Sequence, residues 1–168
     1  EPSTVSSGDL EVSLETIATG DIEQLIGRLE STGNDGSQHE QFEIETAEAF
    51  GRLGFHAQWL GKSGRTDVLL EAELGRGASY RVIVDCKSTW RGAVSNQIDW
   101  DTIDEHREQH QADYAVVLAP DFGGGRLTDR ARNHETVLLK IDDLAELLRL
   151  HQETPLTLDD YRLLFTTE

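Results

Sequence analysis

Apolar residues recur along this chain with two spacings, one typical of helices and the other typical of strands. Helical spacing predicts a helix over residues 38–53, where Phe42 and Phe50 share one face. Further helices are predicted over residues 95–110, 127–133, 142–150 and 158–165. Alternating or continuous apolar runs predict strands over residues 55–60, 66–74, 80–87, 114–119 and 136–141. This order of elements predicts an α/β fold in which helices flank a mixed central sheet.

The N-terminal part of the chain carries a weaker pattern than the rest. Residues 1–20 are polar and rich in Ser, Thr and Glu, which predicts an extended or weakly ordered segment. Asp21 is expected to cap a short helix, and the composition of residues 31–37 indicates a loop. We therefore expect an N-terminal segment with a short helix over residues 1–37, followed by one domain over residues 38–168.

Charge is the unusual part of the composition. The 15 basic and 32 acidic residues give a formal net charge of −17, and the acidic excess runs along nearly the whole chain. In low salt this charge disfavours nucleic acid, because contacts to phosphate carry most of that binding. In molar salt the Debye length falls to about 3 Å, so distant carboxylates repel DNA very little. An even acidic coat favours this second interpretation, which predicts a protein of the high-salt cytoplasm of a halophile.

The remaining composition narrows the class of protein. A chain of 168 residues can form one domain with its own core. Cys86 is the single cysteine, so the chain carries no sign of a disulfide-stapled secreted scaffold. It contains neither an apolar run of membrane-spanning length nor a secretory leader, and we expect a cytoplasmic protein without membrane contact. The first residue is Glu1, as expected of an excised domain or a processed terminus.

The candidate chemistry lies at the end of the predicted strand 80–87. Side chains on a strand alternate between faces, so Asp85 and Lys87 leave this strand on the same side. Charge at the end of an apolar strand is costly to bury unless it is paired or holds a metal. If the hairpin formed with the preceding strand turns symmetrically about Arg76, Asp67 lies directly across from Asp85.

Two opposed carboxylates suggest a metal site. Like charges directly across a hairpin destabilise it, and a divalent cation between Asp67 and Asp85 reverses that penalty. Mg²⁺ suits such a pair, because it takes oxygen ligands and keeps waters beside substrate phosphate, and the backbone carbonyl of Cys86 is a third candidate ligand. A metal there can polarise a phosphate oxygen, while Lys87 can orient the attacking water or stabilise growing negative charge. Glu43, on the sheet-facing side of its helix, is a fourth catalytic candidate.

Each candidate also has a simpler interpretation. Asp85 and Lys87 alone are typical of a structural ion pair, and Asp67 follows a loop in which Asp often serves as a turn residue. Glu43 is typical of an exposed helix position, and Cys86 is typical of a small buried apolar residue. The chemical hypothesis therefore depends on the combination of residues and not on any one of them.

The combination resembles the PD-(D/E)xK nucleases, and more closely the FokI-type restriction endonuclease cleavage domains within that superfamily. Asp67, Asp85 and Lys87 match the motif residue by residue, and Thr66 stands where the superfamily often has Pro. The resemblance covers about residues 38–165. It is carried by LGKSGRTD at 60–67, VIVDCK at 82–87 and LTLDDY at 156–161.

The resemblance implies a restriction-endonuclease-like αβββαβ core and Mg²⁺-dependent hydrolysis of DNA phosphodiesters, with Mn²⁺ able to substitute. It also implies a recognition domain elsewhere in a larger protein, and a homodimer of cleavage domains for double-strand cleavage. Phe42-Glu43 resembles the Mrr branch, in which this Glu belongs to the active site. Lys62 and Ser63 in the first stretch, and Gln97 where many relatives place a substrate-side Gln, are the substrate-binding candidates.

Three classes of function remain in competition. The leading interpretation is a DNA endonuclease domain of restriction or repair type over residues 38–168. The alternative is a nuclease-fold module that has lost catalysis and serves DNA docking or protein assembly, and a third is an acidic protein-binding adaptor. The intact set of Asp67, Asp85 and Lys87 favours the first. Metal-binding and cleavage assays distinguish the three.

Overall fold

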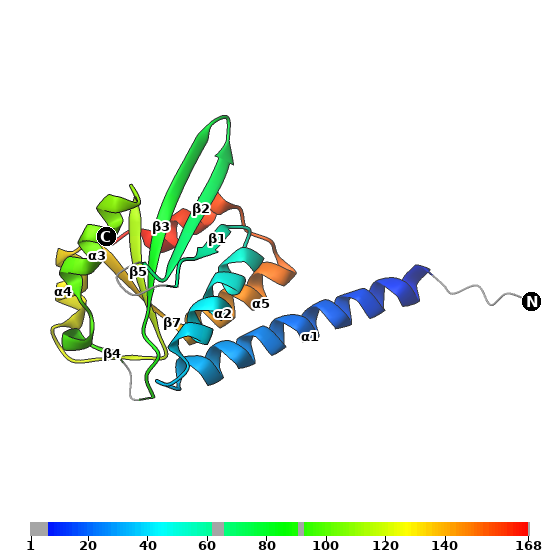
Figure 1. The fold of residues 1–168 in the computed structure, drawn as a ribbon. Helices are drawn as coiled ribbons and strands as arrows, with labels where there is room; N and C mark the ends of the chain where they lie inside the picture. Colours follow the sequence, from blue (N-terminus) through cyan, green and yellow to red (C-terminus); the bar gives the residue numbers. More distant parts are fainter. Residues whose placement is uncertain (1–6, 62–65, 91–92, 168) are drawn as a thin grey trace, which may run out of the picture.

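The computed structural model describes residues 7–61, 66–90 and 93–167 (Figure 1). Within them the helices are α1 (Ser7–Gly33), α2 (His39–Arg52), α3 (Trp100–Gln109), α4 (Leu127–Asn133), α5 (Ile141–Glu153) and α6 (Leu158–Tyr161). Short 3₁₀ turns are η1 (Ser95–Gln97) and η2 (Arg162–Phe165). The strands are β1 (His56–Trp59), β2 (Val68–Gly75), β3 (Ala78–Cys86), β4 (Ala93–Val94), β5 (Tyr114–Ala119), β6 (Phe122–Gly123) and β7 (Thr136–Lys140).

The predicted α/β fold with a mixed sheet is confirmed. In the described residues the central sheet has the strand order β1-β2-β3-β5-β7. The first three strands are antiparallel, and β3, β5 and β7 are parallel to one another. The five predicted strands correspond to these five. The small β4–β6 sheet was not predicted, because strands of two residues have no measurable periodicity.

The β2–β3 hairpin has the register that symmetry about Arg76 predicts. Leu69 pairs with Ile83, and Glu71 pairs with Arg81. Arg76 lies at the tip with a φ of 54°, and the pairing shifts only there, next to Gly75. Because the shift is confined to the tip, the register holds along the rest of the hairpin.

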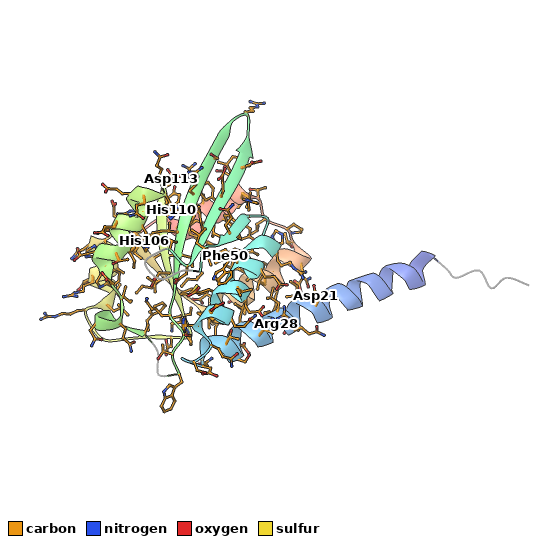
Figure 2. All side chains as sticks on the ribbon, in the orientation of Figure 1. Asp21, Arg28, Phe50, His106, His110 and Asp113 are labelled. Atoms are coloured by element: carbon orange, nitrogen blue, oxygen red, sulfur yellow. The ribbon has the colours of Figure 1, made fainter. Side chains whose placement is uncertain are left out.

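Apolar side chains fill both sides of the sheet. One core lies between the sheet and α1, α2 and α5, and it contains Val84 and Cys86 of β3 with Phe50 of α2. The other lies against α3 and α4 and contains Ile83. Figure 2 labels Phe50 on the α2 side and His106 on the α3 side. Alternation along β3 therefore directs the side chains of Asp85 and Lys87 to the α3 side.

For residues 1–20 we predicted an extended or weakly ordered segment, and the described part is helical and not extended. A single helix, α1, begins at Ser7 and continues to Gly33, so Asp21 lies inside it instead of capping it. Figure 1 shows the N-terminal half of α1 projecting beyond the rest of the chain, where no core imposes an apolar period. The C-terminal half does pack against the domain. Its buried apolar side chains are Ile22, Leu25, Ile26 and Leu29.

The buried half of α1 shares a core with α2, although the boundary between residues 37 and 38 stays a prediction. Arg28 of α1 is paired with Glu45 of α2 at 2.9 Å, and Arg149 of α5 is paired with Glu23 of α1 at 2.7 Å. Both pairs fasten α1 to neighbouring helices.

Across the parts of the chain that the structure describes, no helix combines the length and apolar character needed to cross a membrane.

Candidate active site

Asp67, Asp85 and Lys87 meet where β2 begins and β3 ends. Asp67 directly precedes β2, and its Oδ2 accepts a hydrogen bond of 2.7 Å from the backbone N–H of Cys86. Its carbonyl accepts another of 2.9 Å from the backbone N–H of Leu60. The first bond fixes Asp67 against the end of β3, beside its predicted partners, and the second ties it to the residue that follows β1.

Lys87 and Asp85 form an ion pair inside this site. The Lys87 Nζ lies 2.9 Å from Asp85 Oδ2, and each side chain is less than a third exposed. Asp85 Oδ2 is buried, and the Lys87 ammonium is the one cation placed against it among the described residues. A buried carboxylate oxygen in this state retains capacity for a further ligand.

Burial acts against charge on both members of the pair. It raises the pKa of Asp85, and the positive charge of Lys87 opposes that shift. Burial also pulls the pKa of Lys87 down, but the carboxylates of Asp85 and Asp67 outweigh it, so the pKa of Lys87 is raised. Lys87 is therefore held in its protonated form at neutral pH.

Asp67 carries the clearest sign of crowded negative charge. Burial and then the charge of Asp85 raise its pKa to about 8, with Glu43 adding a smaller effect. The Cys86 N–H and the charge of Lys87 oppose the shift without cancelling it. Without a cation, the site therefore favours a proton on Asp67 at neutral pH.

Glu43 approaches this group from α2 and is buried, so the simpler interpretation of an exposed helix residue is wrong. Its Oε2 accepts a hydrogen bond of 2.9 Å from the indole Nε1–H of Trp59, the last residue of β1. The sequence did not indicate this contact, because it joins residues on separate elements.

Cys86 is a small buried residue, as its simpler interpretation predicted. Burial, with the nearby charge of Asp67, raises the pKa of its thiol well above the usual range, so the thiol stays neutral. The described residues contain no group of three or more His, Cys, Asp or Glu side chains that could hold a metal ion. The carbonyl of Cys86 as a third oxygen ligand stays a prediction.

Gln97 lies on the rim of a polar cleft on the α3 side. The predicted helix 95–110 is divided into η1 and α3, because the side chain of Asp99 accepts from the Thr102 N–H and starts a new helix. The charge of Asp99 also acts on Asp85, so the cleft borders the acidic site. Lys62 and Ser63 fall outside the described residues. The cleft has a volume of about 580 Å³ and is lined by Asn96, Gln97, Ile98, Asp99, Trp100, Asp101, Arg130 and His134.

The fold and the grouping of two aspartates with a lysine define a domain of the restriction-endonuclease-like class. The profile of the FokI cleavage-domain family matches residues 5–117, and the chain belongs to that family. The match covers most of the central sheet, including the hairpin that carries Asp67 and Asp85.

Two solved structures show the same fold. The restriction endonuclease FokI is 18% identical with a TM-score of 0.71, over 83% of this chain and 29% of the FokI chain. FokI bound to DNA is 18% identical with a TM-score of 0.70, over 89% of this chain and 33% of that chain. This chain thus spans about a third of the length of those chains. No curated protein matches it.

Proposed function

We propose that this chain is the metal-dependent cleavage domain of a DNA endonuclease of restriction or repair type. The observation that carries the proposal is the grouping of Asp67, Asp85 and Lys87, in which two largely buried carboxylates lie together and a single ammonium is paired with one of them. Membership of the FokI cleavage-domain family supports the reaction class. DNA as substrate is supported by the solved complex of FokI with DNA.

The residues present fit a hard divalent cation such as Mg²⁺, with Mn²⁺ as a substitute. Asp67 and Asp85 would hold it, together with the backbone carbonyl of Cys86, and all three offer oxygen ligands. The raised pKa of Asp67 supports this fit, because crowded carboxylates are what a cation relieves. The bound cation supplies Lewis-acid polarisation of a phosphate oxygen.

Lys87 stabilises negative charge and is not the base in this scheme. Its raised pKa keeps the ammonium protonated, so it can donate to a phosphate oxygen as charge grows there. The ion pair with Asp85 orients the ammonium before substrate binds. Glu43 lies close enough to act on Asp67, and we assign it a supporting role in the same site.

The residues that contact DNA, the recognition domain and the dimer contact are proposed on the basis of the same nuclease assignment. Lys62, Ser63 and Gln97 are proposed as contacts to the DNA backbone, and Gln97 is exposed beside the polar cleft. Because the chain spans only about a third of the FokI chains, we place sequence recognition in another domain of the full-length protein. The polar outer face of α3 is proposed as the contact of a homodimer that cuts both strands.

The test is incubation of supercoiled plasmid with the domain in high KCl and Mg²⁺. The proposal expects nicked and linear products that EDTA abolishes. The high salt reflects the net charge of −17, which we propose to be an adaptation to a halophile cytoplasm. Intact plasmid at every concentration of Mg²⁺ and Mn²⁺ would contradict the nuclease and favour the catalytically inactive module.

A further inference from the structure

Trp59 joins three elements at the edge of the acidic site. It is the last residue of β1, and it pairs across the sheet with Val68, the residue that follows Asp67. Its indole Nε1–H reaches α2 and donates to Glu43 Oε2 at 2.9 Å. Trp59 therefore lies between the helix that carries Glu43 and the strand beside Asp67.

Gly61, two residues after Trp59, lies against the same indole ring. Gly61 has a φ of 38°, and a Cβ added there would collide with the Cε2, Cζ2 and Nε1 atoms of Trp59. The glycine thus lets the backbone approach the ring next to its hydrogen-bonding nitrogen. The backbone N–H of Leu60, the residue after Trp59, donates to the carbonyl of Asp67. This packing limits the rotation of the indole and directs its N–H toward Glu43.

The hydrogen bond from Trp59 engages Glu43, whose carboxylate acts on Asp67. Glu43 is 8% exposed, and its charge contributes to the perturbation of Asp67. A buried carboxylate needs a partner, and an indole N–H is a neutral donor that engages one oxygen without cancelling the charge. A lysine or arginine in this place would compete with a cation for Glu43, whereas the indole leaves the carboxylate negative.

We infer that Trp59 is a positioning residue that holds the Glu43 carboxylate toward Asp67, so that one oxygen is fixed by the indole and the other can act on the divalent cation. This inference rests on the proposed function, because it deepens the role of Glu43 in the same site. A purely structural hydrogen bond between α2 and β1 would leave metal affinity unchanged. Trp59→Phe keeps an aromatic ring at this partly buried position, so metal-free melting can separate the two roles.

The experiment compares Trp59→Phe, Glu43→Gln and the double variant with the parent. Trp59→Phe removes the donor and keeps an aromatic ring beside Gly61. Gln58→Ala, an exposed position next to Trp59 on β1, is the matched control. The readouts are Mn²⁺ affinity by calorimetry, the Mg²⁺ concentration for half-maximal plasmid nicking, and metal-free melting.

Trp59→Phe should weaken Mn²⁺ binding by about 10–100-fold and raise the half-maximal Mg²⁺ concentration by a similar factor, as the loss of a ligand-orienting partner does. Its metal-free melting should stay close to that of the parent. In the Glu43→Gln background, Trp59→Phe should add little further change, because both substitutions break one contact. Gln58→Ala should leave all three readouts at the parent values.

A second measurement requires no substitution of Trp59. The indole N–H signal of Trp59 in ¹⁵N spectra of the parent should shift when Mg²⁺ is added, and Glu43→Gln should remove this shift. Unchanged metal affinity in Trp59→Phe, full additivity in the double variant, or an unmoved indole signal would overturn the inference. If the parent nicks DNA in an Asp85-dependent way while Glu43→Gln behaves like the parent, only this inference fails. If the parent neither binds Mn²⁺ nor nicks DNA, the proposed function fails with it.

Discussion

Removal of the Asp85 charge should change how the metal-free domain responds to pH. The folded-state pKa of Asp67 is about 8, against an ordinary value of 3.8, so the folded protein holds a proton that the unfolded chain has released. Stability must then fall as pH rises from about 4 toward about 8. At about 1.4 kcal/mol per pH unit, the loss between pH 5 and pH 7 is at most about 3 kcal/mol.

Asp85→Asn removes the largest cause of this shift after burial, so the pKa of Asp67 should fall and the loss of stability should shrink. The ionised Asp67 then faces Lys87, which has lost its ion-pair partner. At pH 7 in EDTA we expect the free energies of unfolding of variant and parent to agree within about 1 kcal/mol. At 100 times its Kd, Mg²⁺ should stabilise the parent by about 2.7 kcal/mol, and the variant much less.

The assay is thermal melting in EDTA and in Mg²⁺ between pH 5 and pH 8. Asp129→Asn, a substitution of an exposed aspartate on α4, serves as the matched control for loss of one negative charge. The decisive quantity is the change in the free energy of unfolding per pH unit, compared between the parent and Asp85→Asn. Equal slopes refute the reasoning about Asp67. A loss of about 3–5 kcal/mol in metal-free Asp85→Asn would instead identify the Asp85–Lys87 contact as a structural buried ion pair.

Three further predictions concern salt, assembly and acid. With a net charge of −17, melting temperature and cleavage should both rise from about 0.1 M toward molar KCl, and a steady loss of stability with added KCl would contradict the halophile interpretation. If α3 forms a homodimer contact, cleavage should rise faster than linearly with protein concentration, whereas linear double-strand cleavage would indicate a monomer. His151 Nδ1 accepts from the Leu156 N–H and contacts the Tyr161 hydroxyl, and burial lowers its pKa, so this ring should cost stability as pH falls below about 6.5. His151→Gln should remove that acid-side loss in melting experiments, and an unchanged acid profile would exclude His151 as its source.

Most of the fold could be predicted because apolar alternation records which side of each element is buried. The predicted bounds of β5 and α4 coincide with the observed ones. The N-terminal half of α1 could not be predicted, because residues 7–20 carry only a weak helical apolar period in the sequence. The break at Asp99 was missed because one local side-chain bond outweighs the propensity of its neighbours.

The site could be predicted only as far as the hairpin extends. Asp85 lies on β3, while Asp67 directly precedes β2 and Lys87 directly follows β3, so alternation and turn symmetry bring them together. Glu43 depends on how α2 packs against β1, and the bond from Trp59 spans separate elements that no spacing in the sequence connects. The metal-ligand and substrate roles of these residues stay predictions.

The central claim is that Asp67 and Asp85 bind the cation while Lys87 acts on the substrate. The most direct measurement pairs Mn²⁺ calorimetry with plasmid nicking in Asp67→Asn, Asp85→Asn and Lys87→Ala. The account predicts that both aspartate variants lose metal binding and cleavage, whereas Lys87→Ala binds Mn²⁺ at least as tightly as the parent and still fails to cut. Cleavage at the parent rate by Lys87→Ala, or undiminished Mn²⁺ affinity in both aspartate variants, would contradict the assignment.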